Sequence, residues 1–428
     1  MKNIIEDLFQ RGLIKDITSE DKVLRLINEG KAVYCGFDPT ADSLHVGSLL
    51  PLITLLRLKK AGVNVKPLIG GATGMIGDPS FKENERSLNS KDVVDNFKLK
   101  IIQQIKSIIG SDTTVVDNFE WTKNLNILDF LRDTGKFFTV NTMLKKDSVK
   151  SRIERDDQGI SFTEFTYQIL QGMDFHHLFK HENCAIQMGG SDQWGNMIAG
   201  IDLINKKESN AEVGVFTLPL LLKSDGQKFG KSESGAVWLS ADKTSPFQFF
   251  QFWLNISDEE VKKFFKMLSL KTVEEIDQIF KDDEGREKPL AQQILAEELT
   301  EIVHGKKSLK EVLAIKKVLF EQNWDSVSEE DLKILSDGKN IKTIEVNKLE
   351  IENDLIQLLV SWNIVKSKRE SREMIKNNAI KINGNIVNFE KCLDETGKVF
   401  NLLPEFWIFD NFMLIQKGKK LFTLIKSK

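Results

Sequence analysis

Three short segments of the chain combine glycines with side chains that can bind phosphate or ammonium groups. The first, DPTADSLHVGS (38–48), leads from an apolar run into a helical pattern. The N-terminus of a helix offers unpaired N–H groups and a partial positive charge, which suit phosphate. His45 can donate to phosphate oxygens, and Gly47 leaves room for a flat ring on the backbone. Taken alone, this pattern is also typical of a capped helix with a buried histidine.

The other two segments add charged side chains. GGATGMIGDPS (70–80) is neither a GxGxxG fingerprint nor a P-loop, but its Asp78 offers a carboxylate to an ammonium group. Lys82 and Arg86 follow four residues apart, so they share one face if this stretch is helical. In KFGKS (228–232), Lys228 and Lys231 could stabilise charge that develops on a polyphosphate in a transition state. A surface turn and an ordinary basic loop are the alternatives.

Strands that alternate with helices must position these segments. The apolar runs at 32–38, 64–69, 184–190 and 215–222 are each followed by a turn, and helical spacing follows at 49–62 and from about 195. Such alternation predicts a parallel α/β sheet. From Pro246 the pattern becomes helical, 326–352 is polar and weakly patterned, and Asn383-Gly384 between apolar stretches predicts a hairpin.

Composition excludes several classes of protein. The 428 residues are 41% hydrophobic and 29% charged, which is typical of a globular protein. No apolar run approaches the roughly 18 residues of a membrane span, and the acidic start MKNIIEDLFQRG disfavours a signal peptide, so we expect a cytoplasmic protein without a membrane partner. Three cysteines far apart exclude a disulfide scaffold. His176, His177, His181 and Cys184 lack a second ligand cluster nearby, so we predict no metal site.

Two counts are unusual. The chain has 28 Phe but only 2 Tyr, so Tyr34 and Tyr167 stand where a hydroxyl matters, unless a mutational bias or an engineered sequence explains the scarcity. Residues 355–428 carry 13 basic and 7 acidic side chains, on a chain whose net charge is −3. This basic tail indicates either an anionic partner or a solvated lysine-rich surface.

Together, the motifs resemble a known family. HVGS (45–48) and KFGKS resemble the HIGH and KMSKS signatures of class I aminoacyl-tRNA synthetases. YCGFDPTADSLHVG, ISFTEFTYQILQGMDF and GGSDQWGN resemble bacterial tyrosyl-tRNA synthetases, and the resemblance covers nearly the whole chain. The tail SKRESREMIKNNAIKING is similar to the S-four-type RNA-binding fold that ends these enzymes. The chain departs from the family at Ser48, which replaces the second histidine of HIGH, so we expect its ATP affinity to differ from that of the family.

The resemblance implies a fold and an activity. It implies a Rossmann-like parallel-sheet catalytic domain (1–240), a helical domain (241–325), a linker (326–352) and a small α+β RNA-binding domain (353–428). The enzyme would activate L-tyrosine with ATP, using Mg²⁺ on the phosphates, and transfer it to the 3′ end of tRNA(Tyr) as a homodimer. The attacking carboxylate is already ionised at neutral pH, so no general base is needed.

Two alternatives remain open at this point. The first is a catalytically inactive paralogue that only binds structured RNA. It would be expected to lose Lys231, Asp78 or Asp174, and all three are present. The second is another nucleotidyltransferase of the same fold that activates a different acid, and the basic tail argues against it.

The resemblance also implies roles for individual residues. For tyrosine, Tyr34 and Asp174 would flank the phenol, and the ammonium and carboxylate would be held by Asp78, Tyr167, Gln171 and Gln193. The residues that match the family's ATP site are Cys35, Asp38, Gly47, Ser48, Gly190, Asp192 and Lys231. Those that match its catalytic phosphate contacts are Thr40, His45, Lys82, Arg86, Lys228, Lys231 and Ser232. On a predicted helix face of the tail, Arg369, Arg372 and Lys376 would contact the tRNA backbone.

Overall fold

The computed structural model describes most of the chain. The described residues are 4–80, 90–146, 149–150, 153, 159–222, 229–232, 235–284, 290–320, 327–337, 341–347, 355–387, 406–418 and 421–427. The chain forms two compact units, Met1–His304 and Gly305–Lys428. Within these residues no helix has both the length and the apolar character that a membrane crossing requires.

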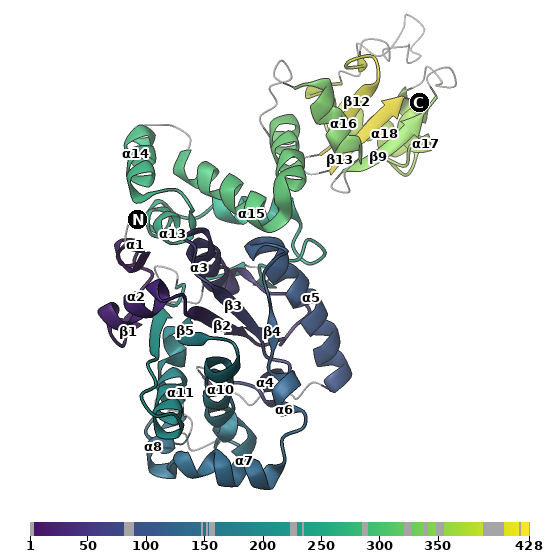
Figure 1. The fold of residues 1–428 in the computed structure, drawn as a ribbon. Helices are drawn as coiled ribbons and strands as arrows, with labels where there is room; N and C mark the ends of the chain where they lie inside the picture. Colours follow the sequence, from purple (N-terminus) through teal and green to yellow (C-terminus); the bar gives the residue numbers. More distant parts are fainter. Residues whose placement is uncertain are drawn as a thin grey trace, which may run out of the picture. The chain divides into compact units, whose positions relative to one another are not determined.

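The first unit is built on a six-stranded sheet with the strand order β1-β6-β5-β2-β3-β4 (Figure 1). Neighbouring strands from β6 to β4 run parallel, and β1 at the edge is antiparallel to β6. The parallel sheet predicted from the sequence is therefore confirmed. The strands are β1 (Asp16–Ile17), β2 (Ala32–Phe37), β3 (Val65–Ile69), β4 (Val116–Asp117), β5 (Cys184–Gly190) and β6 (Gly214–Leu218).

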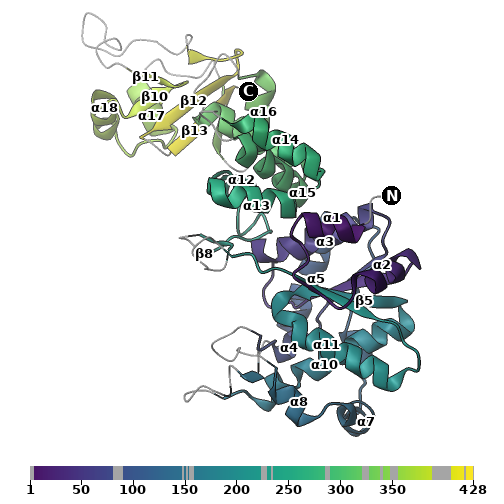
Figure 2. The ribbon, with the colours of Figure 1, turned by 90° about the vertical axis from the view of Figure 1, so that its left-hand side faces the viewer.

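Helices cover both faces of this sheet, with α3 and α5 on one face and α10 and α11 on the other (Figures 1 and 2). Strands covered on both faces are expected to be continuously apolar, and β5 and β6 are buried along almost their whole length. The helices on the sheet and at its edges are α1 (Ile4–Gln10), α2 (Glu20–Asn28), α3 (Leu49–Lys60), α4 (Thr73–Ile76), α5 (Lys91–Ile109), α6 (Phe119–Thr122), α7 (Ile127–Asp133), α8 (Val140–Leu144), α10 (Phe162–His181) and α11 (Trp194–Lys207).

The helical pattern after Pro246 begins inside the first unit. Helices α12 (Pro246–Leu254), α13 (Asp258–Leu268) and α14 (Val273–Asp283) each start with a capping box, in which a Ser or Thr hydroxyl and a Gln or Glu side chain pair with the first backbone N–H groups. Helix α15 (Leu290–Ile315) has non-helical angles at Gly305, where the second unit begins. The two units therefore divide the chain within the range 241–325 that we expected to be one helical domain.

The second unit contains a five-stranded sheet with the order β11-β10-β12-β13-β9. The predicted hairpin is confirmed, because β10 and β11 pair through Ile382↔Asn385 around Asn383 and Gly384, both of which have positive φ. The elements are α16 (Glu329–Asp337), β9 (Lys342–Val346), α17 (Leu355–Ser361), α18 (Lys368–Lys376), β10 (Ile380–Ile382), β11 (Asn385–Ile386), β12 (Phe412–Lys417) and β13 (Leu421–Ser427).

The range 326–352, expected to be a linker, holds ordered elements of this second unit. It contains α16 and β9, and β9 pairs in parallel with β13 at the edge of the sheet, from Thr423↔Lys342 to Ser427↔Val346. Ile344 and Val346 of β9 pack against the buried core of the unit, and Glu345 between them is exposed, as expected for a strand with one solvated face. Because its partner strand lies about eighty residues later in the chain, no local sequence pattern predicts the pairing of β9 with β13.

Candidate functional site

A cavity of about 410 Å³ lies at the carboxyl ends of the parallel strands β2, β5 and β6. This is the edge at which open α/β sheets bind their ligands. The cavity brings together predicted site residues from segments far apart in the sequence. They are Tyr34, Cys35, Asp38, Thr40, His45, Gly47, Ser48, Asp78, Tyr167, Gln171, Asp174, Gly190, Asp192 and Gln193.

One end of the cavity presents a buried hydroxyl and a buried carboxylate. Tyr34 on β2 is 2% exposed and Asp174 on α10 is 4% exposed. The Tyr34 hydroxyl has no hydrogen-bond partner among the described residues, whereas Asp174 accepts bonds from Asn118 Nδ2 at 2.9 Å and Trp121 Nε1 at 2.8 Å. Each carboxylate oxygen can accept a further bond. This end can therefore bind a ligand hydroxyl between a donor and an acceptor.

Burial controls the protonation of both groups. It raises the pKa of the Asp174 carboxyl to about 7, against the opposing effect of the bonds from Asn118 and Trp121. Burial, with the Asp174 charge nearby, also raises the pKa of the Tyr34 phenol well above its ordinary value. Tyr34 therefore stays a neutral hydroxyl at neutral pH, and Asp174 titrates there.

A chain of side-chain hydrogen bonds supports this end. Asn118 accepts a bond from the Ala72 N–H at 2.7 Å and donates to Thr73 Oγ1 at 3.0 Å as well as to Asp174. Thr73 in turn donates to Asp38 Oδ1 at 2.7 Å. A Cβ on Gly70 would overlap the Asp38 carboxylate, so the glycine-rich turn can come this close only with a glycine there.

The middle of the cavity offers acceptors for an ammonium group. The Tyr167 hydroxyl donates to Asp38 Oδ2 at 2.8 Å, and Gln193 Nε2 donates to Asp78 Oδ2 at 2.7 Å. Gln171 Oε1 is buried and lacks a hydrogen-bond partner within the part of the chain that the structure describes. A ligand ammonium could donate to Gln171 and Asp78, both of which line the cavity. Asp38, which was predicted to contact ATP, accepts bonds from Tyr167 and Thr73, so its carboxylate lies against this part of the cavity.

The other end of the cavity contains the HVGS turn. His45 precedes a 3₁₀ turn at Val46–Ser48, which leads directly into α3, and Pro51 falls in the first turn of α3, where proline is tolerated. His45 Nδ1 accepts a bond from the Gly47 N–H at 2.9 Å. A neutral imidazole that accepts at Nδ1 carries its proton on Nε2, and an N–H donor of this kind suits a phosphate oxygen.

Several predicted phosphate contacts fall on residues of which the structure describes little. Lys82, Arg86 and Lys228 lie outside the described residues. The backbone of Lys231 and Ser232 forms β7, which pairs with β8 (Gly235–Ala236). Their roles remain predictions.

The structure adds cavity residues that sequence reasoning missed. Thr73 and Gln187 line the cavity, and Gln187 Oε1 is a further buried acceptor with no partner among the described residues. Asn118 and Trp121 follow β4 and reach the cavity through Asp174. A polar residue directly after a strand is the signal that could have found Asn118, but β4 has only two residues and no periodic pattern.

The histidines of α10 have protein partners. His176 Nε2 is 2.7 Å from Glu208 Oε1, and His177 stacks on Trp121 with a centroid distance of 4.2 Å. His181 lies beside His177 at 4.6 Å. His177 therefore packs against the Trp121 indole, whose Nε1 donates to Asp174. In the second unit, Arg369, Arg372 and Lys376 are exposed on α18.

Comparison with known proteins agrees with this geometry. The family described as tRNA synthetases class I (W and Y) matches residues 28–321, and the Tyrosine--tRNA ligase SYY-like C-terminal domain matches residues 334–425. Tyrosine--tRNA ligase 1 of Vibrio parahaemolyticus is 44% identical over 99% of this chain and 98% of that protein. Tyrosine--tRNA ligase 1 of Bacillus subtilis is 43% identical, with both chains fully covered.

Solved structures show the same likeness. A C-terminally truncated mitochondrial tyrosyl-tRNA synthetase of Aspergillus nidulans matches with a TM-score of 0.67 and 32% identity, over 75% of this chain and 95% of that chain. Plasmodium falciparum tryptophanyl-tRNA synthetase matches in fold, with a TM-score of 0.52 and 16% identity over 78% of this chain and 90% of that chain. The resemblance seen in the sequence motifs is thus confirmed, and the chain belongs to the class I tRNA synthetases of the tryptophan and tyrosine group, among the bacterial tyrosine–tRNA ligases.

Proposed function

We propose that this chain is a tyrosine–tRNA ligase that forms tyrosyl-adenylate and pyrophosphate from L-tyrosine and ATP, and then transfers tyrosine to the 3′ end of tRNA(Tyr). The observation that carries the proposal is the buried Tyr34 hydroxyl, which has no hydrogen-bond partner in the described part of the chain and lies beside Asp174 in the same cavity as the HVGS turn. Relatives that bear the ligase name over their full length support this activity and not an RNA-binding paralogue without catalysis.

The tyrosine half of the cavity would orient the nucleophile. The substrate phenol would accept a bond from the Tyr34 hydroxyl and donate one to the Asp174 carboxylate. The substrate ammonium would lie near Asp78, Tyr167 and Gln171. Gln193 would lie near the carboxylate, whose oxygen attacks the α-phosphorus of ATP. The bond from that phosphorus to the bridging oxygen breaks, and pyrophosphate leaves with the electron pair. Because no proton has to move, positioning and charge stabilisation account for the rate.

The nucleotide half would hold ATP through backbone and small residues. We assign the ribose and adenine to the cavity residues Cys35, Asp38, Gly47, Ser48, Gly190 and Asp192. Thr40 and His45 would contact the γ-phosphate, and the charge of the leaving pyrophosphate would be stabilised by Lys82, Arg86, Lys228, Lys231 and Ser232. Mg²⁺ would enter with the nucleotide, since it usually keeps several waters and binds through substrate phosphates.

The second unit would bind tRNA. Its sequence is basic, and Arg369, Arg372 and Lys376 are exposed on α18. If they contact phosphates, replacing all three by Glu should abolish most tRNA charging and leave tyrosine-dependent pyrophosphate exchange unchanged. Normal charging by this variant would remove α18 from the proposed tRNA site. A truncation that removes the second sheet should end before α16, because an end after β9 would leave that strand without its partner β13.

We also propose a homodimer, which the exposed apolar side chains of the first unit support. Large apolar residues are exposed on α7, on α8 and at the start of α10, and they include Leu128 at 71% and Phe162 at 76%. The three helices share one buried cluster, formed by Phe130, Met143 and Ile169. Apolar surface of this kind marks interaction sites. Val140 and Phe162 lie in the segments 137–144 and 160–165, and the resemblance to tyrosyl-tRNA synthetases suggests that these segments form the dimer interface. Sedimentation of Leu128→Asp and Phe162→Asp variants should show monomers.

Pyrophosphate exchange with each of the twenty amino acids tests the activity itself. We expect exchange with tyrosine and at most trace exchange with the others, followed by tyrosine attachment to tRNA(Tyr). If exchange is strongest with another amino acid, that amino acid and not tyrosine is the substrate. A protein that binds tRNA but exchanges no acid would instead favour the paralogue. We place the reaction in the cytoplasm, where tRNA is charged in bacteria.

A further inference from the structure

Phe229, inside the KFGKS motif, belongs to an aromatic cluster outside the cavity lining. Its side chain is 6% exposed, and its ring centroid lies 4.2 Å from Phe264, 5.1 Å from Phe252 and 5.5 Å from Trp253. Phe252 and Trp253 belong to α12, and Phe264 belongs to α13. A residue between two motif lysines is thus held by the helices that follow the motif.

The next residue places the same backbone against the HVGS turn. Gly230 has a φ of +98°, and a Cβ built on it would lie 3.4 Å from Val46 Cβ and 3.6 Å from the Gly47 nitrogen. The Val237 N–H donates to the Gly230 oxygen, and the Val46 N–H donates to the Val237 oxygen, both at 2.9 Å. The two phosphate motifs therefore lie close together and are joined through the backbone of Val237, and Phe229 adjoins that link.

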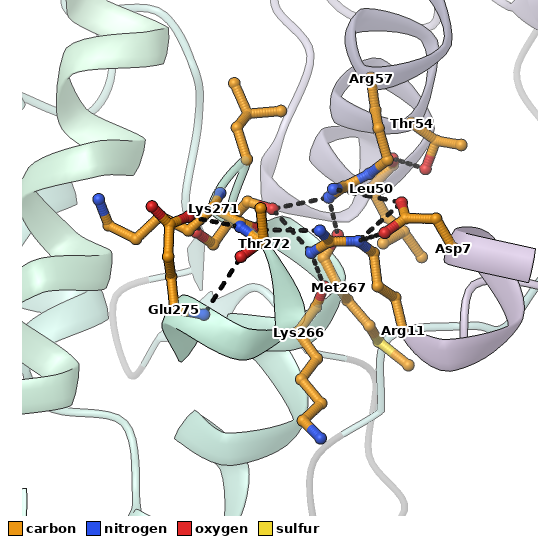
Figure 3. A network of polar contacts seen from close by, with 12 residues as sticks. Asp7, Arg11, Leu50, Thr54, Arg57, Lys266, Met267, Lys271, Thr272 and Glu275 are labelled. Carbon is orange, nitrogen blue, oxygen red and sulfur yellow. Dashed lines mark hydrogen bonds and ion pairs between the residues drawn. The ribbon is translucent and has the colours of Figure 1, made fainter. Parts of the chain in front are cut away.

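Helix α13 is also tied to the far end of the helix that starts at HVGS. Arg57, near the end of α3, donates to the Met267 and Ser269 oxygens at 3.2 and 2.7 Å (Figure 3). Arg11 donates to the Lys266 and Lys271 oxygens at 3.1 and 2.7 Å. The bonds to Lys266, Met267 and Ser269 satisfy carbonyls at the end of α13, and the bond to Lys271 reaches the segment that follows it. Helix α13 thus holds α3 through Arg57 and holds KFGKS through Phe264.

We infer that Phe229 is a positioning residue for tyrosine activation, which sets where the KFGKS backbone meets the HVGS turn by seating in the aromatic cluster of α12 and α13. The inference rests on the proposed function, because it concerns the step that the two motifs would serve. Its physical basis is that reacting groups must be placed to within about an ångström, and that a misplacement of this size can cost about 100-fold in rate. An emptied aromatic site would let the motif backbone shift without touching the tyrosine pocket.

The test compares two phenylalanines of the same region. Phe265 on α13 is fully buried but pairs with Phe280 at 5.8 Å instead of Phe229, so Phe265→Ala is the matched control. In Phe229→Ala we expect the rate of adenylate formation to fall about 100-fold, with the tyrosine Kd within about twofold of wild type. In Phe265→Ala we expect both quantities to stay within about threefold of the wild-type values. Phe229→Met should restore most of the rate, because the flexible Met side chain can fill the space of the missing ring and contact the neighbouring aromatic rings.

All variants are assayed as full chains at a temperature where circular dichroism shows each to be folded, and Leu replaces Ala at both positions if either Ala variant is not. Phe229→Ala with a wild-type rate of adenylate formation overturns the inference. So does an equal loss in Phe265→Ala, which would trace the effect to general loosening of α13. Wild-type protein that exchanges no pyrophosphate with tyrosine would instead refute the proposed function, which separates the two failures.

Discussion

The two ends of the cavity are built in opposite ways. The end with Tyr34 and Asp174 uses buried side chains, and each is fixed by packing or by hydrogen bonds to other side chains. The end with HVGS uses an exposed histidine, a glycine and backbone N–H groups at the start of α3. The first end offers hydrogen bonds in a dry site, and the second offers backbone dipoles in a site that water reaches.

The difference follows from what each end must recognise. A neutral hydroxyl is distinguished from a missing one only if its partners are buried, because water would otherwise satisfy them. A polyphosphate is recognised by charge, and it must enter and leave at every turnover. Selectivity should therefore depend on the buried end, and rate should depend on the exposed end. The predictions below test this division, from the largest effect to the smallest.

The largest effect is expected for Asp174→Ala. Phenylalanine offers no hydroxyl to the Tyr34 donor or to the remaining acceptor sites of Asp174, which is why hydroxyl-binding sites reject such analogues; the known value for tyrosyl-tRNA synthetases is about 10⁵. Without Asp174 we expect the ratio of kcat/KM for tyrosine over phenylalanine to fall at least about 1,000-fold. Asp202→Ala, an aspartate outside this cavity, should leave the ratio unchanged. An unaltered ratio in Asp174→Ala would refute the phenol assignment.

Lys231→Ala should separate rate from binding. Removing one group that stabilises transition-state charge commonly costs about 100-fold, so adenylate formation should slow by about that factor. The tyrosine Kd should stay within about twofold, since the buried end is untouched. Lys262→Ala, an exposed lysine on α13, is the matched control. A large rise in the tyrosine Kd with normal turnover would reverse the roles of the two ends.

The sequence predicted the sheet and the residues of both ends of the cavity. The strand–helix alternation predicted the parallel sheet, and the resemblance to the family placed Tyr34, Asp174 and His45 in one site although they lie far apart in the chain. The parallel sheet explains why they meet, because the ends of β2 and β5 bring their loops to one edge. The motif positions were identified by their joint resemblance to the family signatures, because each motif taken alone is also typical of a capped helix, a surface turn or a basic loop.

The side chains that hold the motif residues in place could not be predicted from the sequence. Asn118 and Trp121 follow a strand of two residues, and their bonds to Asp174 span more than fifty positions of the chain. The expectation that the range containing β9 is a linker has the same cause, because its partner strand β13 lies far away in the sequence. Local patterns report the periodicity of an element, whereas buried polar networks depend on which elements the fold brings together.

The pH dependence of tyrosine binding tests the buried end more finely. If the substrate hydroxyl donates to the charged Asp174, binding requires the deprotonated carboxyl, whose pKa is about 7. At pH 6 about one-tenth of the protein carries that charge and at pH 8 about nine-tenths, so the Kd should fall about tenfold between them. Asp174→Asn should show a flat profile in the same titration. A profile that is equally flat in the wild type would mean that the protonated acid binds the phenol as well as the carboxylate does.

The smallest effect, and the most specific to the network, is expected for Asn118→Ala. The Asn118 bond favours the charged form of Asp174, so its loss should raise the Asp174 pKa above about 7 and move the midpoint of the Kd profile to higher pH. Tyrosine affinity at pH 7 should fall roughly threefold to tenfold as a result. The unpaired Ala72 N–H should also lower the free energy of unfolding by about 1–3 kcal/mol.

Asn126→Ala is the control for that variant. Asn126 caps α7 through a bond from the Leu128 N–H at 2.8 Å, and its side chain is away from the cavity lining. Its loss should lower the free energy of unfolding by about 1 kcal/mol without moving the midpoint of the Kd profile. If both asparagine variants left that midpoint in place, the hydrogen bonds behind Asp174 would stabilise the fold alone, and burial by itself would determine how the buried end binds tyrosine.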